Sequence, residues 1–137
     1  MTAERLFIDT AYVQALLNKK DNYHNQAQAV YPRLAKVREL WTTEAILVEI
    51  GNALSSINRV VATGFINICY NLPNMTVVAV DTSLLKRSLQ LYENRHDKEW
   101  GLTDCISFVV MQEQGLFDAL TMDHHFKQAG FHPIMEP

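Results

Sequence analysis

The chain has 137 residues, of which 48% are hydrophobic and 20% are charged, and it contains 5 glycines and 4 prolines. This length predicts a single domain over residues 1–137, and this composition excludes a disordered, linker-like or collagen-like chain. The net charge of −3 at pH 7 disfavours a protein that coats nucleic acid through a basic surface, although it permits an enzyme that meets phosphate through metal ions.

Short apolar runs alternate with segments of helical spacing in the first half of the chain. The expected elements are, in order, a strand at residues 5–8, a helix around 13–17, a helix at 22–40, a strand at 41–43, and helices at 44–56 and 60–72. Pro32 lies inside the second of these helices and is expected to kink or break it.

The second half of the chain continues the alternation. Residues 76–80 are the clearest strand in the sequence because they are β-branched or apolar throughout. The other expected elements are a helix from 81 to about 95, a helix that opens at Thr103, a strand at 118–121, a helical turn at 123–128 and an edge strand at 131–135. The helix after Thr103 is apolar on nearly every side, so we expect most of its faces to be buried.

This order of elements predicts the class of fold. Strands that are apolar on both faces and alternate with helices indicate an α/β fold, with a central parallel sheet flanked by helices. Ligands bind such sheets at the carboxyl ends of the strands, where the chain turns into the helices. The candidate functional residues are therefore those at the strand ends.

Acidic residues occupy these positions. Asp9, Asp81 and Asp123 each follow a predicted strand, and Asp104 lies in the first turn of the buried helix. Capping explains each aspartate taken alone, since an aspartate at a helix start stabilises it by about 0.5–2 kcal/mol. Glu49 interrupts an apolar helical stripe, so it requires either a basic partner or a cation shared with other carboxylates. Mg²⁺ and Mn²⁺ prefer such oxygen ligands.

Four blocks of sequence occur in an order that is typical of one protein family. The blocks are residues 7–10 with 15–18 and 21–24 behind them, residues 42–43 with 47–54, residues 102–111, and residues 120–131. Each block alone is a weak signal, but together they span nearly the whole chain. On these residues the chain resembles the PIN-domain proteins of the VapC-like type, which are the toxin ribonucleases of toxin–antitoxin pairs.

The resemblance implies a Rossmann-like sheet with an acidic pocket that holds one or two Mg²⁺ or Mn²⁺ ions. The family's catalytic and metal-binding acids fall on Asp9, Glu49, Asp104 and Asp123. The hydroxyl residues of the pattern, which are less secure matches than the acids, fall on Thr10 and Thr121.

Several other polar residues compete with this set or lie beside it. Glu44 could replace Glu49, but it lies too close to the threonines at 42–43 for the family pattern. Asp81 has the same flanking sequence pattern as Asp9, yet the family does not use it, so we interpret it as a helix cap. The residues with no assigned role are His124 and His125, which cannot both face one point on a helix, and Asp97 and Glu99, which are expected in a solvated loop.

The resemblance also implies a reaction and partners. The reaction is hydrolysis of an RNA phosphodiester, and the implied partners are the RNA substrate, a cognate antitoxin and a second copy of the chain. Apolar helices around residues 12–17 and 60–70 could supply the protein interfaces, although core packing explains them equally well. The basic residues available to steer RNA are dispersed along the chain rather than clustered.

Two alternatives come from other functional classes. One is a PIN-like module that binds a partner without catalysis, against which the four intact acids argue. The other is a receiver-like phosphoacceptor switch, which needs an acidic pair after the first strand, where this chain has Asp9 alone.

Other features bear on the compartment. No apolar run approaches the roughly 18 residues of a membrane helix, and the first residues lack the pattern of a signal peptide. Cys69 and Cys105 lie in apolar segments without CxxC spacing, which is typical of buried reduced thiols. We therefore expect a cytoplasmic protein without a membrane partner.

Overall fold

A five-stranded sheet forms the centre of the molecule, and its strands all run parallel. The computed structural model describes residues 3–136. The strands are β1 (Arg5–Ile8), β2 (Glu39–Thr43), β3 (Met75–Val78), β4 (Asp118–Leu120) and β5 (His132–Pro133). Their order across the sheet is β3-β2-β1-β4-β5, which confirms the predicted α/β fold with a central parallel sheet.

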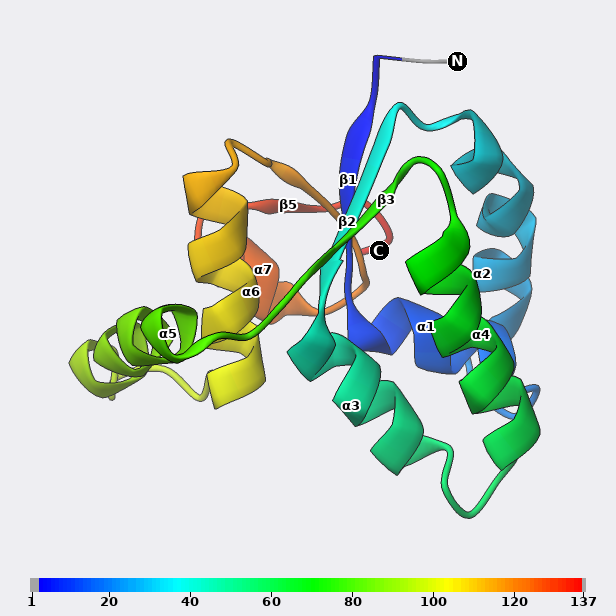
Figure 1. Cartoon of the computed structure of the whole chain (residues 1–137), viewed down its shortest axis with the longest axis horizontal. Helices are drawn as coiled ribbons and strands as arrows, with labels where there is room; N and C mark the ends of the chain where they lie inside the picture. Colours follow the sequence, from blue (N-terminus) through cyan, green and yellow to red (C-terminus); the bar gives the residue numbers. More distant parts are fainter. Residues whose placement is uncertain (1–2, 137) are drawn as a thin grey trace.

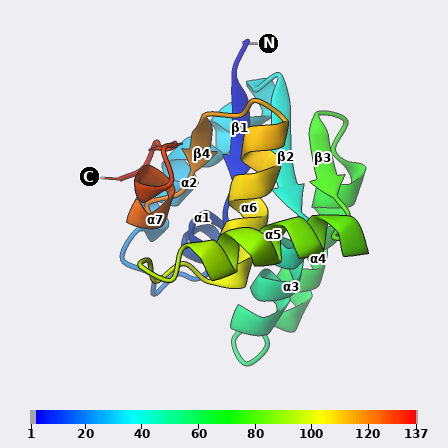
Figure 2. The ribbon, with the colours of Figure 1, turned by 90° about the vertical axis from the view of Figure 1, so that its left-hand side faces the viewer.

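Helices cover both faces of this sheet (Figures 1 and 2). They are α1 (Thr10–Leu17), α2 (His24–Val30), the 3-10 helix η1 (Tyr31–Lys36), α3 (Glu44–Ala53), α4 (Arg59–Asn71), α5 (Thr82–Asn94), α6 (Leu102–Glu113) and α7 (His124–Gln128). In Figure 1, α1, α2 and α4 lie on one side of the sheet, and α6 and α7 lie on the other. Among residues 3–136, no helix combines the length and the apolar character needed to cross a membrane.

The core is built around the central strand β1. Leu6 and Phe7 are fully buried, and Ile8 is 2% exposed. α6 is buried along most of its length, as its apolar sequence predicts. Its Phe108 ring meets the Phe126 ring of α7 edge-on, with the ring centroids 5.0 Å apart. This contact packs the short helix α7 against α6, and both helices begin beside the carboxyl ends of the strands.

The helix expected at residues 22–40 is wrong in its second half. There α2 gives way to η1, and β2 has begun before residue 40. Pro32, at the start of η1, has no N–H to donate, and its ring clashes with the preceding turn of an α-helix. The Asn74 side chain donates to the carbonyls of Leu34 and Val37, at 3.2 and 2.9 Å, and so satisfies groups that a continuous helix would have bonded internally.

The strands at the two edges of the sheet are shorter than predicted. The strand expected at residues 76–80 is β3, which ends at Val78 and lies at the edge of the sheet. The backbone N–H of Val80 donates to Glu44 Oε1 at 3.3 Å, so at this residue a side chain replaces the hydrogen bond to a neighbouring strand. The strand expected at 131–135 is only the two residues of β5, at the other edge.

Candidate active site

The strand order creates a switch point beside β1. From β1 the chain builds β2 and then β3 on one side, and it places β4 and β5 on the other. In open parallel sheets a ligand-binding crevice lies at this reversal, outside the carboxyl ends of the two central strands. Asp9 follows β1 and Asp123 lies just beyond β4, so the two aspartates stand at this point. The backbone N–H of Asp9 donates to the carbonyl of Leu120 at 3.4 Å, which joins the two strand ends.

An open cleft of about 590 Å³ lies at this position. Its lining residues are Asp9, Thr10, Ala11, Gln14, Glu49, Asn52, Ala53, Asp104 and Asp123. The structure thus brings together all four acids that the sequence singles out. No lysine or arginine is among the described residues that line the cleft. Carboxylates gathered in this way repel one another and form a site that suits a cation.

Asp9 is the most deeply buried of the four acids, with a residue exposure of 5%. It occupies the N-cap position of α1, yet its side chain caps nothing. Instead, Asp9 Oδ2 accepts a hydrogen bond from the Thr121 hydroxyl at 2.8 Å. The pKa of Asp9 is raised to about 7, mainly by burial and also by the charges of Asp104 and Asp123, while the Thr121 hydrogen bond opposes the increase. Capping does not explain this aspartate, because its carboxylate faces the cleft and the neighbouring acids.

Glu49 reaches the cleft from α3. Its Oε1 accepts a hydrogen bond of 2.6 Å from the hydroxyl of Thr10, the first residue of α1. The alternative explanation for Glu49 was an ion pair, but in the described part of the chain no basic residue lines the cleft. The hydroxyls of Thr10 and Thr121 therefore each bond to one of the acids, which gives both threonines a place in the site.

Asp104 and Asp123 lie at the starts of α6 and α7. Asp104 Oδ2 accepts from the backbone N–H of Gly101 at 3.2 Å and lies 3.2 Å from His125 Nδ1. Burial is the main cause that raises the pKa of Asp104, and the charge of Asp123 adds to it, whereas Gly101 and His125 oppose it. Asp123 Oδ1 caps α7 by accepting from the backbone N–H of His125 at 2.9 Å.

The competing acids lie outside the cleft. Asp81 caps α5, accepting from the backbone N–H of Leu84 at 2.8 Å, as predicted. Glu44 accepts hydrogen bonds from the Tyr70 hydroxyl at 2.9 Å and from the backbone of Val80, so it ties α3 to α4 and to the end of β3. Neither residue lines the cleft.

The acids of the predicted loop are also accounted for. Asp97 forms an exposed ion pair with Arg95, with Asp97 Oδ1 3.0 Å from the guanidinium Nε. Glu99 is exposed. Neither lines the cleft, in agreement with a solvated loop.

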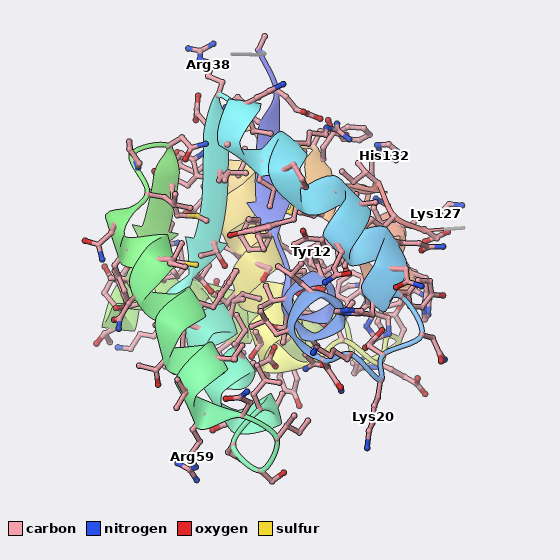
Figure 3. All side chains as sticks on the ribbon, turned by 90° about the vertical axis from the view of Figure 1, so that its right-hand side faces the viewer. Tyr12, Lys20, Arg38, Arg59, Lys127 and His132 are labelled. Carbon is pink, nitrogen blue, oxygen red and sulfur yellow. The ribbon has the colours of Figure 1, made fainter. Side chains whose placement is uncertain are left out.

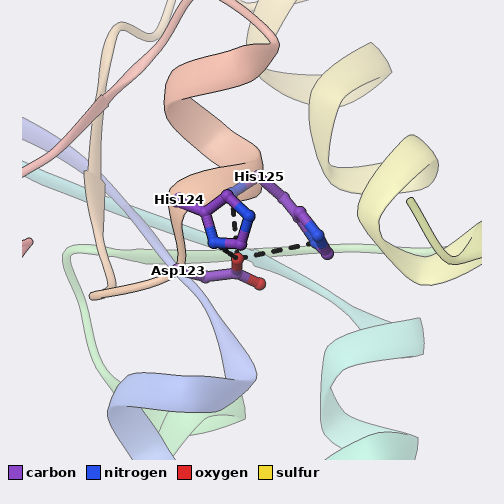
Figure 4. Close-up of side chains that lie close together, drawn as sticks. All are labelled: Asp123, His124 and His125. Atoms are coloured by element: carbon purple, nitrogen blue, oxygen red, sulfur yellow. Dashed lines mark hydrogen bonds and ion pairs between the residues drawn. The ribbon is translucent and has the colours of Figure 1, made fainter. Parts of the chain in front are cut away.

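The expectation that His124 and His125 cannot face one point is wrong (Figure 4). Their ring centroids lie 4.7 Å apart, and their Nδ1 atoms lie 3.9 and 3.5 Å from the same oxygen, Asp123 Oδ1. The expectation holds for residues inside a helix, but these two are the first residues of α7. The N-cap side chain of Asp123 folds back over that first turn and so meets both rings.

Gln14 and Asn52 also line the cleft, and neither was expected there from the sequence. Gln14 lies four residues after Thr10 on α1, and Asn52 lies three residues after Glu49 on α3. Residues three or four apart share a helix face, so this spacing was a usable signal. Both amides offer a donor and an acceptor at the mouth of an otherwise acidic cleft.

Comparisons with known proteins agree with this geometry. A family profile described as "PIN domain" matches residues 6–132. The chain is 30% identical, over 135 residues, to the "23S rRNA-specific endonuclease VapC20" of two Mycobacterium tuberculosis strains, CDC 1551 / Oshkosh and ATCC 25618 / H37Rv, covering 92% of this chain and 95% of that protein.

Two solved structures share the fold. One is the crystal structure of M. tuberculosis VapC20, described as a sarcin–ricin loop cleaving toxin, with a TM-score of 0.83 and 23% identity over 94% of this chain and 98% of that one. The other is FitAcB from Neisseria gonorrhoeae, with a TM-score of 0.65 and 15% identity over 93% of this chain and 95% of that one.

Proposed function

Because the chain belongs to the PIN-domain family and is a nuclease of the VapC kind, we propose that it hydrolyses RNA phosphodiester bonds with the help of Mg²⁺ or Mn²⁺. The ions are held by Asp9, Glu49, Asp104 and Asp123. The observation that carries this proposal is the cleft itself, in which four carboxylates converge and no lysine or arginine of the described chain is present. A phosphate backbone could not approach these acids unless cations neutralised them.

The donor set fits a hard divalent ion. All four acids offer oxygen atoms, which are the ligands that Mg²⁺ and Mn²⁺ prefer. Burial and the neighbouring charges raise the pKa of Asp9 to about 7, as expected for a carboxylate that is poorly solvated without a cation. When bound, the ion lowers the pKa of a coordinated water and stabilises charge on the attacked phosphate.

The threonines position the acids. The Thr121 hydroxyl donates to Asp9 and accepts from the backbone N–H of Asp123 at 3.1 Å, so one side chain fixes two strand ends. The Thr10 hydroxyl holds Glu49 from the start of α1. These bonds limit the rotation of the carboxylates, so that their oxygens remain directed at the cleft.

We propose structured ribosomal RNA as the substrate class, on the basis of the 30% identity to a protein named for its action on 23S rRNA. Four of the basic residues do not share one patch: in Figure 3, Arg38, Arg59, Lys20 and Lys127 lie at separate edges of the molecule. Binding of the RNA backbone therefore depends on the ions in the cleft more than on a basic surface.

The test is cleavage of a sarcin–ricin loop RNA by the purified chain, with excess EDTA and then with added Mn²⁺ or Mg²⁺. We expect cleavage with either ion and none with EDTA. An Asp123→Asn preparation, purified in parallel, controls for contaminating ribonucleases. Full cleavage in EDTA contradicts the metal proposal, whereas Mn²⁺ binding without cleavage of any RNA supports the non-catalytic alternative.

We further propose that the chain is the toxin of a toxin–antitoxin pair and forms a homodimer. Of the two expected interfaces, the one around residues 12–17 is buried in its first half, where Tyr12 and Val13 are fully buried, whereas Leu16 and Leu17 line an apolar groove. Several apolar side chains of α4 are exposed, among them Val60 at 82% and Tyr70 at 54%. An apolar groove between α1, η1 and α4, with a volume of about 350 Å³, suits an apolar segment of the antitoxin. Light scattering that detects only monomer at high micromolar concentration contradicts the homodimer.

A further inference from the structure

One edge of the cleft has a different donor set from the rest. At the start of α7, two imidazoles stand over the Asp123 carboxylate (Figure 4). His124 Nδ1 and His125 Nδ1 lie 3.9 and 3.5 Å from Asp123 Oδ1, and one ligand atom from each of the three residues lies within 4.8 Å of the others. Asp104 Oδ2 is a further donor, 3.2 Å from His125 Nδ1.

These distances match those between the ligands of a tetrahedral metal ion. Zinc–nitrogen and zinc–oxygen bonds of about 2.0–2.2 Å at tetrahedral angles separate neighbouring ligand atoms by about 3.3–3.6 Å. The observed separations of 3.2, 3.5 and 3.9 Å lie close to this range. The longest separation, 3.9 Å, is that of His124 Nδ1 from Asp123 Oδ1. The His124 side chain is 67% exposed, so it can turn far enough to shorten this distance by a few tenths of an ångström.

The chemistry of the donors selects the kind of ion. Imidazole nitrogen suits Zn²⁺, Cu²⁺ and Ni²⁺, whereas Mg²⁺ takes oxygen ligands. We propose that Asp123, His124 and His125 form a site for a transition-metal ion such as Zn²⁺, which shares Asp123 with the four-carboxylate set but adds two imidazole donors. The four-acid cleft thus continues into a mixed nitrogen and oxygen site, and Asp123 belongs to both.

This sharing has a consequence that rests on the proposed nuclease function. A zinc ion at the start of α7 engages Asp123 and draws in Asp104, which lies within 3.2 Å of the His125 ring. The oxygen-only site then loses two of its four carboxylates. Zinc would therefore inhibit the reaction that Mg²⁺ or Mn²⁺ supports, because it would engage carboxylates that are needed to hold that ion.

The binding test uses zinc alone and does not depend on activity. Isothermal titration of the chain with Zn²⁺ is compared for the wild type, His124→Gln, His125→Asn and the control His132→Gln. His132 is a matched control because its Nδ1 lies 2.8 Å from Asp118 on an exposed surface, and it belongs to no group of three possible metal ligands among the described residues. We expect about tenfold or greater loss of zinc affinity in the first two variants, as for disturbed metal sites in general, and no change in His132→Gln.

A cross-check separates the two metal sites. Asp9→Asn is expected to weaken Mn²⁺ binding strongly while changing zinc affinity less than about threefold. Equal zinc affinity in the wild type and His124→Gln overturns the proposal, because zinc would then bind the acids alone. A loss of zinc affinity in Asp9→Asn as large as that in His124→Gln also overturns it. His124 is exposed, so that variant keeps the test valid even where His125→Asn fails to fold.

Inhibition is measured last. RNA cleavage is measured with Mg²⁺ as the supporting ion. The zinc concentration that inhibits the wild type and His132→Gln is expected to be at least about tenfold lower than the concentration that inhibits His124→Gln. Equal inhibition of all three contradicts the inhibitory role. If no variant cleaves RNA, the proposed function fails, whereas the zinc titrations still decide whether the site exists.

Discussion

At the scale of single residues, the three aspartates that follow predicted strands differ in what their side chains bind. Asp81 and Asp123 each accept a hydrogen bond from the first turn of the helix that follows. Asp9 makes no such bond, and its carboxylate turns to Thr121, 112 residues away. Local sequence predicts the cap at Asp81 correctly, but it carries no trace of the partner that distinguishes Asp9. Only the family pattern separated the two.

The pair Asp9→Asn and Asp81→Asn tests this difference. If Asp9 holds a cation, the amide removes the charge that attracts it, and RNA cleavage should fall by at least about 100-fold. In Asp81→Asn the amide should cap α5 about as well as the aspartate does. Cleavage should therefore stay within about twofold of the wild type, and the melting temperature should stay within about 2 °C. Both are measured with Mn²⁺ on the same RNA. Similar losses of activity in the two variants would place the cleft's function elsewhere.

The two histidines depart from the side-chain geometry of a helix interior. Inside a helix, the side chains of successive residues point about 100° apart. His124 and His125, however, lie in the first turn of α7. There the N-cap side chain approaches from outside the helix, so it contacts both rings. An aspartate placed immediately before two histidines and a helix is therefore a candidate group of nitrogen and oxygen ligands.

At the scale of elements, α3 carries two glutamates with opposite roles. Glu49 reaches the cleft and bonds to Thr10, whereas Glu44 bonds to Tyr70 and the backbone of Val80. Five residues correspond to about 140° around a helix, which directs the two side chains to different faces. The spacing argument from the sequence chose Glu49, and the structure supplies the physical reason for the other glutamate.

Glu49→Gln and Glu44→Gln should separate activity from stability. We expect Glu49→Gln to lower Mn²⁺-supported cleavage at least about tenfold with little change in stability, because Thr10 can still donate to the amide oxygen. Glu44→Gln should keep cleavage within about twofold and lower the free energy of unfolding by about 0.5–1.5 kcal/mol, since it weakens bonds that join three elements. Cleavage assays and urea unfolding measure the two effects. A Glu44→Gln enzyme that folds normally but is inactive would contradict the choice of Glu49.

Element boundaries were harder to predict than element types. Helical periodicity continues through η1, so it could not show that the backbone changes from α2 to a 3-10 helix at Pro32. The strand propensity of residues 76–80 is the highest in the chain, yet β3 is an edge strand that ends when Glu44 accepts the N–H of Val80. The end of β3 thus depends on a side chain distant in sequence, which local patterns do not contain.

At the scale of the whole molecule, the cleft concentrates negative charge where burial makes it costly. The pKa of Asp9 is raised from 3.8 to about 7 and that of Asp104 is raised in the same direction, both mainly by burial. A carboxyl whose pKa is raised on folding stabilises the fold while it is protonated. The resulting contribution to the free energy of unfolding is complete below about pH 3.9, and it is lost as the pH rises towards about 7.

The metal-free chain should therefore become less stable between about pH 4 and about pH 7, and divalent cations should reverse the loss. In EDTA we expect the melting temperature to fall over this range by several degrees more for the wild type than for Asp9→Asn, which has no carboxylate to ionise at that position. Saturating Mn²⁺ at neutral pH should restore the wild type and affect Asp9→Asn much less. Scanning calorimetry across the pH series measures both. A wild-type melting temperature that does not respond to Mn²⁺ counts strongly against a metal site.

The arrangement of β1 beside β4 also bears on how the protein is made. The hydrogen bond from Thr121 to Asp9 joins the two ends of the chain, and pairing over such a separation comes late in folding. A nascent chain that has been translated through α4 carries Asp9 and Glu49 but lacks Asp104, Thr121 and Asp123. Such a chain has no cleft. If ribosomal RNA is the substrate, as proposed above, the ribosome that synthesises the chain is not exposed to cleavage until β4 has been made and has docked against β1.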